Sequence, residues 1–200
     1  MPNICVFGDS VAFGASDEIS GGWVNRLKVF CLNHMEDTTI YNLGICGDTT
    51  EDVLKRIDIE AEAREPQIII FAIGINDSSH ITTKEHPYVD ENLFLENLSI
   101  LFTKASKFTK SVIFIGLTPL DQSRTMPIPW DTTRYYDENN VKKYNTLLIS
   151  FCDKHKLPFI NVRDTLSIKD LSDGLHPNSK GHEKIFEKVK EFLLKHNLLK

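Results

Sequence analysis

The sequence lacks several patterns that assign proteins to common functional classes. It contains no run near the roughly 20 consecutive apolar residues of a membrane-spanning helix, so we expect no integral membrane association. It also lacks the glycine-rich strings G-x-x-x-x-G-K-[ST] and G-x-G-x-x-G, so it has no recognisable nucleotide-binding loop. Its basic residues form no cluster and its formal net charge is −5, which argues against nucleic acid or an anionic membrane as the main partner.

Cysteine is scarce, and its spacing indicates neither a metal site nor a redox motif. No C-x-x-C pair is present, so zinc and thioredoxin-like sites have no support. We expect Cys46, beside Gly47, to be a small packing residue. Reduced thiols fit a cytoplasmic protein, and the N-terminus carries no basic region followed by a cleavable apolar segment. We therefore expect a cytoplasmic location, with a trimmed signal peptide as the alternative. The four cysteines are Cys5, Cys31, Cys46 and Cys152.

The chain does contain a regular alternation of strand-like and helix-like segments. Its 200 residues suit a single domain, residues 1–200, with enough chain for a three-layer core. Several short runs are apolar at successive positions, which is typical of strands covered on both faces of a parallel sheet. These runs are residues 3–7, 39–43, 67–73, 111–117 and 158–162.

Helical spacing of apolar residues fills the segments between the strand-like runs. Trp23, Leu27 and Phe30 recur at intervals of four and three, which places them on one helix face. The alternation of strand and helix predicts right-handed crossovers and an α/β/α sandwich. The same helical spacing recurs in residues 53–61, 94–108, 141–151 and 185–192.

Two connections are longer than a compact fold needs, residues 77–90 and 118–137. Both follow predicted strands, and the ligand crevice of an open α/β sheet lies beyond the carboxyl ends of the strands. The second connection contains the aromatic residues Trp130 and Tyr135, which we consider as substrate-binding residues. The alternative is a proline-stiffened surface loop whose aromatic side chains cover the core.

Residues 6–10 deliver a serine, Ser10, just after the end of the first predicted strand. A serine hydroxyl is a weak nucleophile unless an adjacent base takes its proton and a third group orients that base. Asp173 and His176 are three residues apart on a predicted turn, where the carboxylate can fix the tautomer of the imidazole. Asp9 is expected to hydrogen-bond within the serine turn, and we also consider it as a substrate-binding residue.

Attack on a carbonyl creates an oxyanion, and that oxyanion needs positioned hydrogen-bond donors. The turn after the second predicted strand contains Gly44 and Gly47, and glycine leaves its N–H unshielded by a side chain. Asn76, just past the third predicted strand, offers a side-chain amide. The backbone N–H of Ser10 is a third candidate donor.

These blocks resemble, in order and spacing, those of the SGNH hydrolases, also called the GDSL esterase/lipase family. The resemblance spans nearly the whole chain. The segment that begins at Gly47 reads G-D-T, as in the family's second block, and this favours Gly47 over Gly44 as the oxyanion glycine. Val11 stands where the family name has leucine, and the position is apolar either way.

The resemblance implies a flavodoxin-like sandwich with a five-stranded parallel sheet, and hydrolysis of carboxylic esters or thioesters without a metal or organic cofactor. The expected partner is a small-molecule ester or thioester with a small or short acyl group. The sequence does not indicate the oligomeric state. Two alternatives are an acyltransferase that uses the same triad and a non-catalytic flavodoxin-like binding module. A metal site that pairs His182 with Asp173 lacks further ligands in the sequence. The implied catalytic residues are Ser10, Asp173 and His176, and the implied oxyanion hole comprises Ser10, Gly47 and Asn76.

Overall fold

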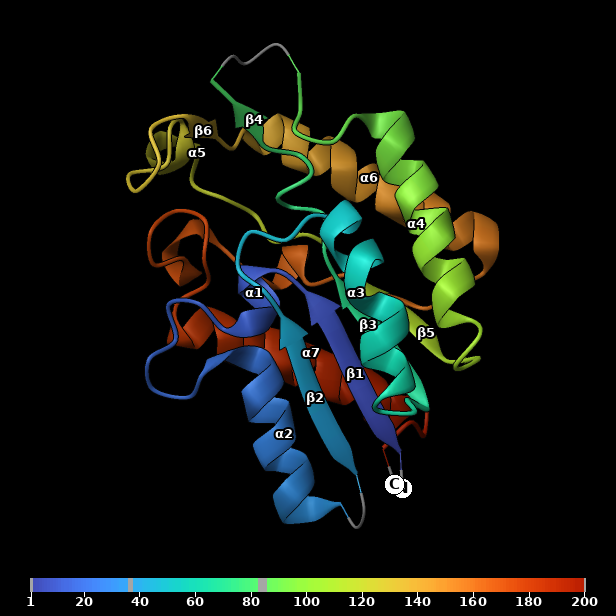
Figure 1. Ribbon diagram of the computed structural model, residues 1–200. Helices are drawn as coiled ribbons and strands as arrows, with labels where there is room; N and C mark the ends of the chain where they lie inside the picture. Colours follow the sequence, from blue (N-terminus) through green and yellow to red (C-terminus); the bar gives the residue numbers. More distant parts are fainter. Residues whose placement is uncertain (1, 36–37, 83–85, 200) are drawn as a thin grey trace.

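A five-stranded sheet forms the centre of the computed structural model, which describes residues 2–35, 38–82 and 86–199 (Figure 1). The strands are β1 (Asn3–Gly8), β2 (Thr39–Gly44), β3 (Ile68–Ala72), β5 (Val112–Ile115) and β7 (Phe159–Ile160). Their order is β2-β1-β3-β5-β7, and every neighbouring pair is parallel. The predicted three-layer α/β sandwich is confirmed, and each strand lies within or close to its predicted run.

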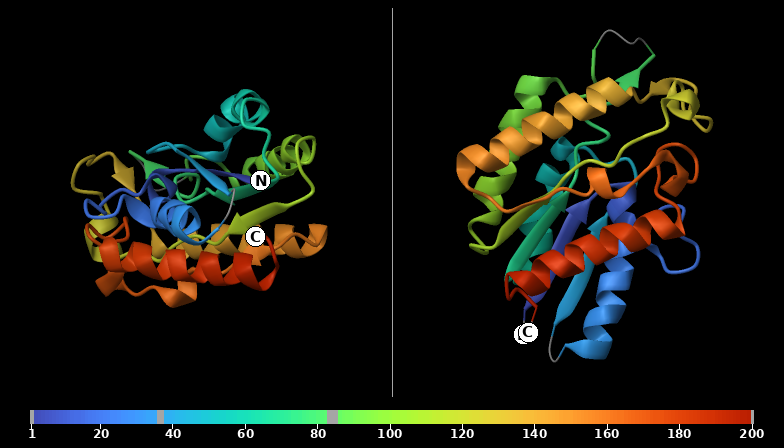
Figure 2. Two further views of the ribbon diagram at one scale, coloured as in Figure 1. Left: turned by 90° about the horizontal axis from the view of Figure 1, so that it is seen from below. Right: turned by 180° about the vertical axis from the view of Figure 1, so that it is seen from behind.

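Helices cover both faces of this sheet (Figures 1 and 2). They are α2 (Gly22–His34), α3 (Thr50–Glu62), α4 (Glu91–Ala105), α6 (Glu138–His155) and α7 (Ser179–Lys195). Apolar residues of α3, α4 and α6 pack with Cys5 and Phe7 of β1 in one core, and those of α2 and α7 pack with Ile4 and Val6 in the other. Successive strand residues therefore face different cores, which explains the uninterrupted apolar runs.

Side-chain caps define where several of these helices begin. The carboxylate of Asp90 accepts hydrogen bonds from two backbone N–H groups of the first turn of α4, and Asp137 does the same for α6. Asn178 caps α7 by accepting from the Gly181 N–H at 3.0 Å. Within the described residues, no helix is both long and apolar enough to cross a bilayer.

The two long connections are joined to each other beyond the carboxyl ends of the central strands. The two-residue strands β4 (His80–Ile81) and β6 (Arg134–Tyr135) pair antiparallel, and the second connection also contains the short helix α5 (Gln122–Thr125). Figure 1 shows these elements on the side toward which the arrows of β1 and β2 point. The sequence did not predict them, because two-residue strands leave no periodic pattern.

The end of β1 leaves no room for a side chain at Gly8. A Cβ atom there would lie 2.4 Å from the carbonyl oxygen of Ala72 and 2.6 Å from the Cβ of Ala12. This close approach lets the chain turn directly into α1 (Ser10–Phe13). Ser10 is thus the first residue of a short helix at the carboxyl edge of the sheet.

Candidate active site

Ser10, His176 and Asp173 form a continuous chain of hydrogen bonds at this edge. The Nε2 atom of His176 lies 2.9 Å from Ser10 Oγ, across 166 positions of sequence. Its Nδ1 atom lies 2.7 Å from Asp173 Oδ2. With the ring proton on Nδ1, Nε2 is left as an acceptor that faces the serine hydroxyl. A nucleophile, a general base and an orienting carboxylate require this geometry.

The segment that carries Asp173 and His176 is held by its own hydrogen bonds. Asp173 Oδ1 accepts from the backbone N–H groups of Leu175 and His176 at 2.9 and 2.8 Å. Partial burial of the Asp173 carboxyl opposes its ionisation, but the hydrogen bonds from the His176 ring and from these N–H groups outweigh burial and lower its pKa to about 2. Asp173 therefore stays ionised at neutral pH, as a group that orients an imidazole must.

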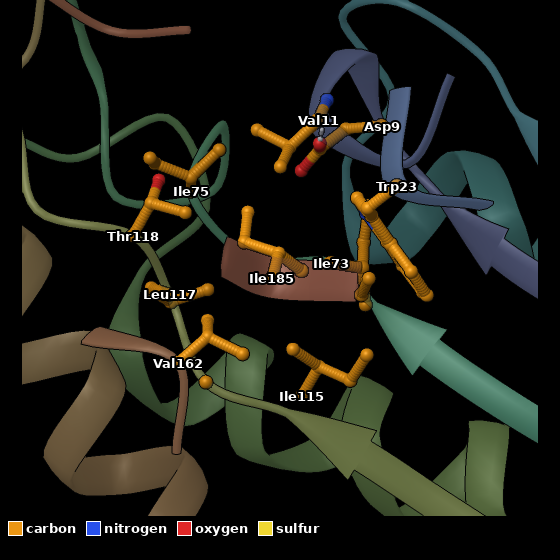
Figure 3. Close-up of a pocket in the computed structure, with 12 residues that line it drawn as sticks. Asp9, Val11, Trp23, Ile73, Ile75, Ile115, Leu117, Thr118, Val162 and Ile185 are labelled. Carbon is orange, nitrogen blue, oxygen red and sulfur yellow. Dashed lines mark hydrogen bonds between the residues drawn. The ribbon is translucent and has the colours of Figure 1, made fainter. Parts of the chain in front are cut away.

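Asp9 sets the turn that presents Ser10. Its Oδ1 accepts from the Val11 N–H at 2.9 Å, so the expected hydrogen bond within the serine turn is present. The side chain is buried and lines a small cavity of about 20 Å³, together with Val11, Trp23 and Ile75 (Figure 3). Burial against these apolar walls raises the pKa of Asp9 to about 7, although the Val11 N–H and nearby His176 oppose the shift.

The cavity behind Asp9 is separate from the cleft that opens onto Ser10. That cleft has a volume of about 300 Å³, and Ser10, Gly47, Asn76 and His176 all line it, whereas Asp9 does not. Asp9, considered above as a substrate-binding residue, thus lines the small cavity and not the cleft. Its carboxyl contacts the turn that holds Ser10 through the Val11 N–H.

Gly47 and Gly44 have different roles. Gly47 lines the cleft with a φ of +87°, and its N–H donates to no other atom of the described residues. Gly44 is part of β2, and a Cβ there would lie 2.3 Å from the backbone nitrogen of Phe13. Gly44 thus permits the close packing of α1 on β2, while Gly47 has a free donor at the cleft.

The Asn76 side chain lines the cleft, and both ends of its amide are hydrogen-bonded. Its Nδ2 donates to the carbonyl oxygen of Asp48 at 2.9 Å, which leaves one N–H for another acceptor. Its Oδ1 accepts from the hydroxyl of Tyr136 at 2.6 Å. The Asp48 carboxylate in turn pairs with Arg56 of α3 at 2.8 Å, so the loop that carries Gly47 is tied to a helix.

The connection of residues 118–137 forms one wall of the cleft. Trp130 is 53% exposed, and its ring stacks on that of His176 with centroids 5.4 Å apart. Tyr135, in contrast, pairs with His80 in the β4–β6 ladder, and its neighbours Arg134 and Tyr136 line the cleft in its place. Successive residues of an extended segment point to opposite sides, which explains why Arg134 and Tyr136 line the cleft together.

Cys46 does not have the packing role that the sequence predicts. The side chain is exposed and lines the cleft. Partial burial and the nearby carboxylates of Asp9 and Asp48 raise the pKa of this thiol above its usual value.

His182 is fully buried, and its two ring nitrogens lie 3.0 Å from the carbonyl oxygen of Ala15 and 3.3 Å from the backbone nitrogen of Trp23. Its ring therefore anchors the serine loop and α2 to α7.

Comparison with known proteins places the chain in a family. The model of the GDSL-like Lipase/Acylhydrolase family matches residues 6–184, so the chain belongs to this family. An arylesterase of Vibrio mimicus is 25% identical over 202 aligned positions, which cover 96% of this chain and 88% of that protein. An uncharacterized lipoprotein of Bacillus subtilis, YqeF, is 28% identical over 59% of this chain and 49% of its own length.

Solved structures agree with this assignment. A lipase/acylhydrolase from Enterococcus faecalis superposes with a TM-score of 0.81 at 25% identity, over 100% of this chain and 98% of that one. An acetylxylan esterase from Geobacillus stearothermophilus has the same fold, with a TM-score of 0.72 at 18% identity over 95% of this chain and 93% of its own. Family and relatives together identify the chain as a carboxylic ester hydrolase.

The environment of Asp9 predicts a pH dependence of stability. Because folding raises the pKa of this carboxyl from 3.8 to about 7, the folded state binds the proton more tightly than the unfolded state. We expect wild type to lose stability relative to Asp9→Asn as pH rises through this window, since asparagine keeps an acceptor for the Val11 N–H and does not titrate. Urea midpoints measured between pH 4.5 and pH 7.5 check this.

Asp153→Asn provides the control, because it makes the same chemical change at an exposed position of α6. A constant difference between wild type and Asp9→Asn across the same range would contradict the assigned burial of the Asp9 charge.

Proposed function

We propose that the chain cleaves small-molecule carboxylic esters or thioesters through an acyl-enzyme intermediate on Ser10. His176 is the general base and Asp173 orients it. The contact of 2.9 Å between His176 Nε2 and Ser10 Oγ carries the proposal, because it joins a nucleophile to a base that already has its orienting carboxylate.

The reaction proceeds in two halves that use the same groups. His176 takes the Ser10 proton as Ser10 Oγ attacks the acyl carbon, and the oxyanion is stabilised by the N–H groups of Ser10, Gly47 and the Asn76 side chain. His176 then gives that proton to the leaving alcohol or thiol. Water, deprotonated by His176, attacks the acyl-enzyme and releases the acid and the serine hydroxyl.

The shape of the site favours short acyl groups. The cleft of about 300 Å³ is open, and the cavity behind Asp9, of about 20 Å³, has room for roughly one water molecule. A long acyl chain would therefore lie on exposed surface and gain little from burial. The acetyl group named for the Geobacillus stearothermophilus relative agrees with this proposal.

Two further expectations belong to the proposal. A single domain of residues 1–200 accounts for the activity, without a metal or an organic cofactor. A cytoplasmic location is supported by the four cysteines, each of which is a free thiol.

Substitution of the proposed nucleophile tests the mechanism. We expect Ser10→Ala to lower kcat for p-nitrophenyl acetate by at least about 10⁴-fold, because the acyl-enzyme cannot form. A fluorophosphonate should label wild type but not this variant, as read by intact-protein mass. Ser99→Ala, on the exposed side of α4, is the matched control and should keep wild-type turnover. Wild-type turnover by Ser10→Ala would end the proposal.

An acyl-chain series tests the proposed substrate size. We expect kcat/KM to be highest for p-nitrophenyl acetate or butyrate and to fall steeply toward decanoate and dodecanoate, because the cleft offers no enclosed apolar channel of that length. Assays below the critical micelle concentration of each ester keep the comparison valid. A profile that rises with chain length would contradict the short-acyl proposal and leave the serine mechanism intact.

A further inference from the structure

The hydroxyl of Tyr136 meets the amide of Asn76 in the interior of the molecule. The donor–acceptor distance is 2.6 Å, and both side chains are at least 97% buried, with exposures of 2% and 3%. We propose that Tyr136 is a positioning residue, which fixes the orientation of the Asn76 amide so that its free N–H faces the oxyanion. This inference rests on the proposed function, in which Asn76 is an oxyanion donor.

The Asn76 amide must have one orientation to act as a donor. Its two ends have nearly the same shape, but Nδ2 donates and Oδ1 accepts. One Nδ2 hydrogen is bound by the Asp48 carbonyl oxygen, so the other is available at the cleft. A flipped amide would turn the Oδ1 lone pairs toward the Asp48 carbonyl and toward the developing negative charge. That arrangement would repel the transition state.

Tyr136 opposes this flip from the other side of the amide. In the observed orientation its hydroxyl donates to Oδ1, and burial raises its pKa to about 12, so the hydroxyl keeps its proton at neutral pH. A donor on Oδ1 also polarises the amide and strengthens Nδ2–H as a donor, because hydrogen bonds in series reinforce one another. Without the hydroxyl, Oδ1 would be a buried acceptor with no partner.

Several contacts hold the chain around Tyr136, and therefore its hydroxyl, in place. The Tyr136 N–H donates to the Thr125 carbonyl at 2.8 Å, and the Thr125 hydroxyl donates to the Tyr136 carbonyl at 2.9 Å. The Arg134 guanidinium lies 5.9 Å from the centre of the Tyr136 ring, and its Nε donates to Ser79 Oγ at 3.3 Å. Ser79 Oγ then donates to the Asn76 carbonyl oxygen at 2.7 Å. The two long connections therefore hold tyrosine and asparagine together at several points.

A second buried tyrosine, Tyr144, provides a control that distinguishes an effect on catalysis from an effect on stability. Tyr144 is fully buried in the same core, and its hydroxyl donates to the Val89 carbonyl oxygen and not to the Asn76 amide. Tyr136→Phe and Tyr144→Phe each remove one buried hydroxyl and leave one acceptor without that partner. Both should lower stability, but only the first should affect catalysis.

The experiment measures kcat and KM for p-nitrophenyl acetate in wild type, Ser10→Ala, Asn76→Ala and the two tyrosine variants. We expect Tyr136→Phe to lower kcat about tenfold, the effect of one neutral hydrogen bond, with KM within about twofold. Tyr144→Phe should keep kcat within about twofold of wild type. In the Asn76→Ala background, Tyr136→Phe should cause no further loss of kcat, because its effect passes through the amide.

Thermal unfolding confirms that each variant is folded at the assay temperature. If Tyr136→Phe does not fold, Thr125→Val tests the same inference, because it removes the hydrogen bond that the Thr125 hydroxyl donates to the Tyr136 carbonyl and should also lower kcat selectively. Equal kcat in Tyr136→Phe and wild type would overturn the inference, and so would a full tenfold loss in the Asn76→Ala background. Turnover by Ser10→Ala would overturn the proposed function itself, so the two failures are distinguishable.

Discussion

Parallel strands end at one edge of a sheet, and this constraint places Ser10, Gly47 and Asn76 of the candidate site together. Ser10 follows β1, Gly47 follows β2 and Asn76 follows β3. The last block arrives from the far end of the chain and is joined to the first by the His176–Ser10 hydrogen bond. Glycine at position 8 lets β1 run close against β3 and turn at once into α1. Sheet topology therefore brings Ser10, Gly47 and Asn76 to one edge, and the segment that carries Asp173 and His176 completes the site.

Three carboxyl groups near this edge have different electrostatic environments. Asp173 has its charge stabilised by an imidazole and two backbone donors, so its pKa is about 2. Asp9 caps α1 from the interior and has its pKa raised to about 7 by burial. Asp77 is fully buried, accepts from the backbone N–H and hydroxyl of Thr50, and also has a raised pKa, of about 6. Of these three carboxyl groups, Asp173 is the one that hydrogen-bonds the His176 ring, which agrees with the role proposed for it.

Much of this could be predicted from the sequence, for identifiable physical reasons. The central strands were recognisable because both their faces are buried, and the helices because one face of each packs on the sheet. Ser10, Asp173 and His176 were indicated by residue type and order, although their contact depends on tertiary structure. The β4–β6 pair was not predicted, since its strands are two residues long and its pairing partners lie in separate loops.

The central claim is that a single oxyanion site is formed by three chain segments that follow three strands. A crystal structure of the protein after reaction with a p-nitrophenyl phosphonate tests it most directly. The account predicts a covalent bond from Ser10 Oγ to phosphorus, with the phosphoryl oxygen roughly 2.7–3.2 Å from the N–H nitrogens of Ser10, Gly47 and the Asn76 side chain. An adduct on Ser10 whose phosphoryl oxygen points away from all three donors, or an adduct on another residue, would contradict it.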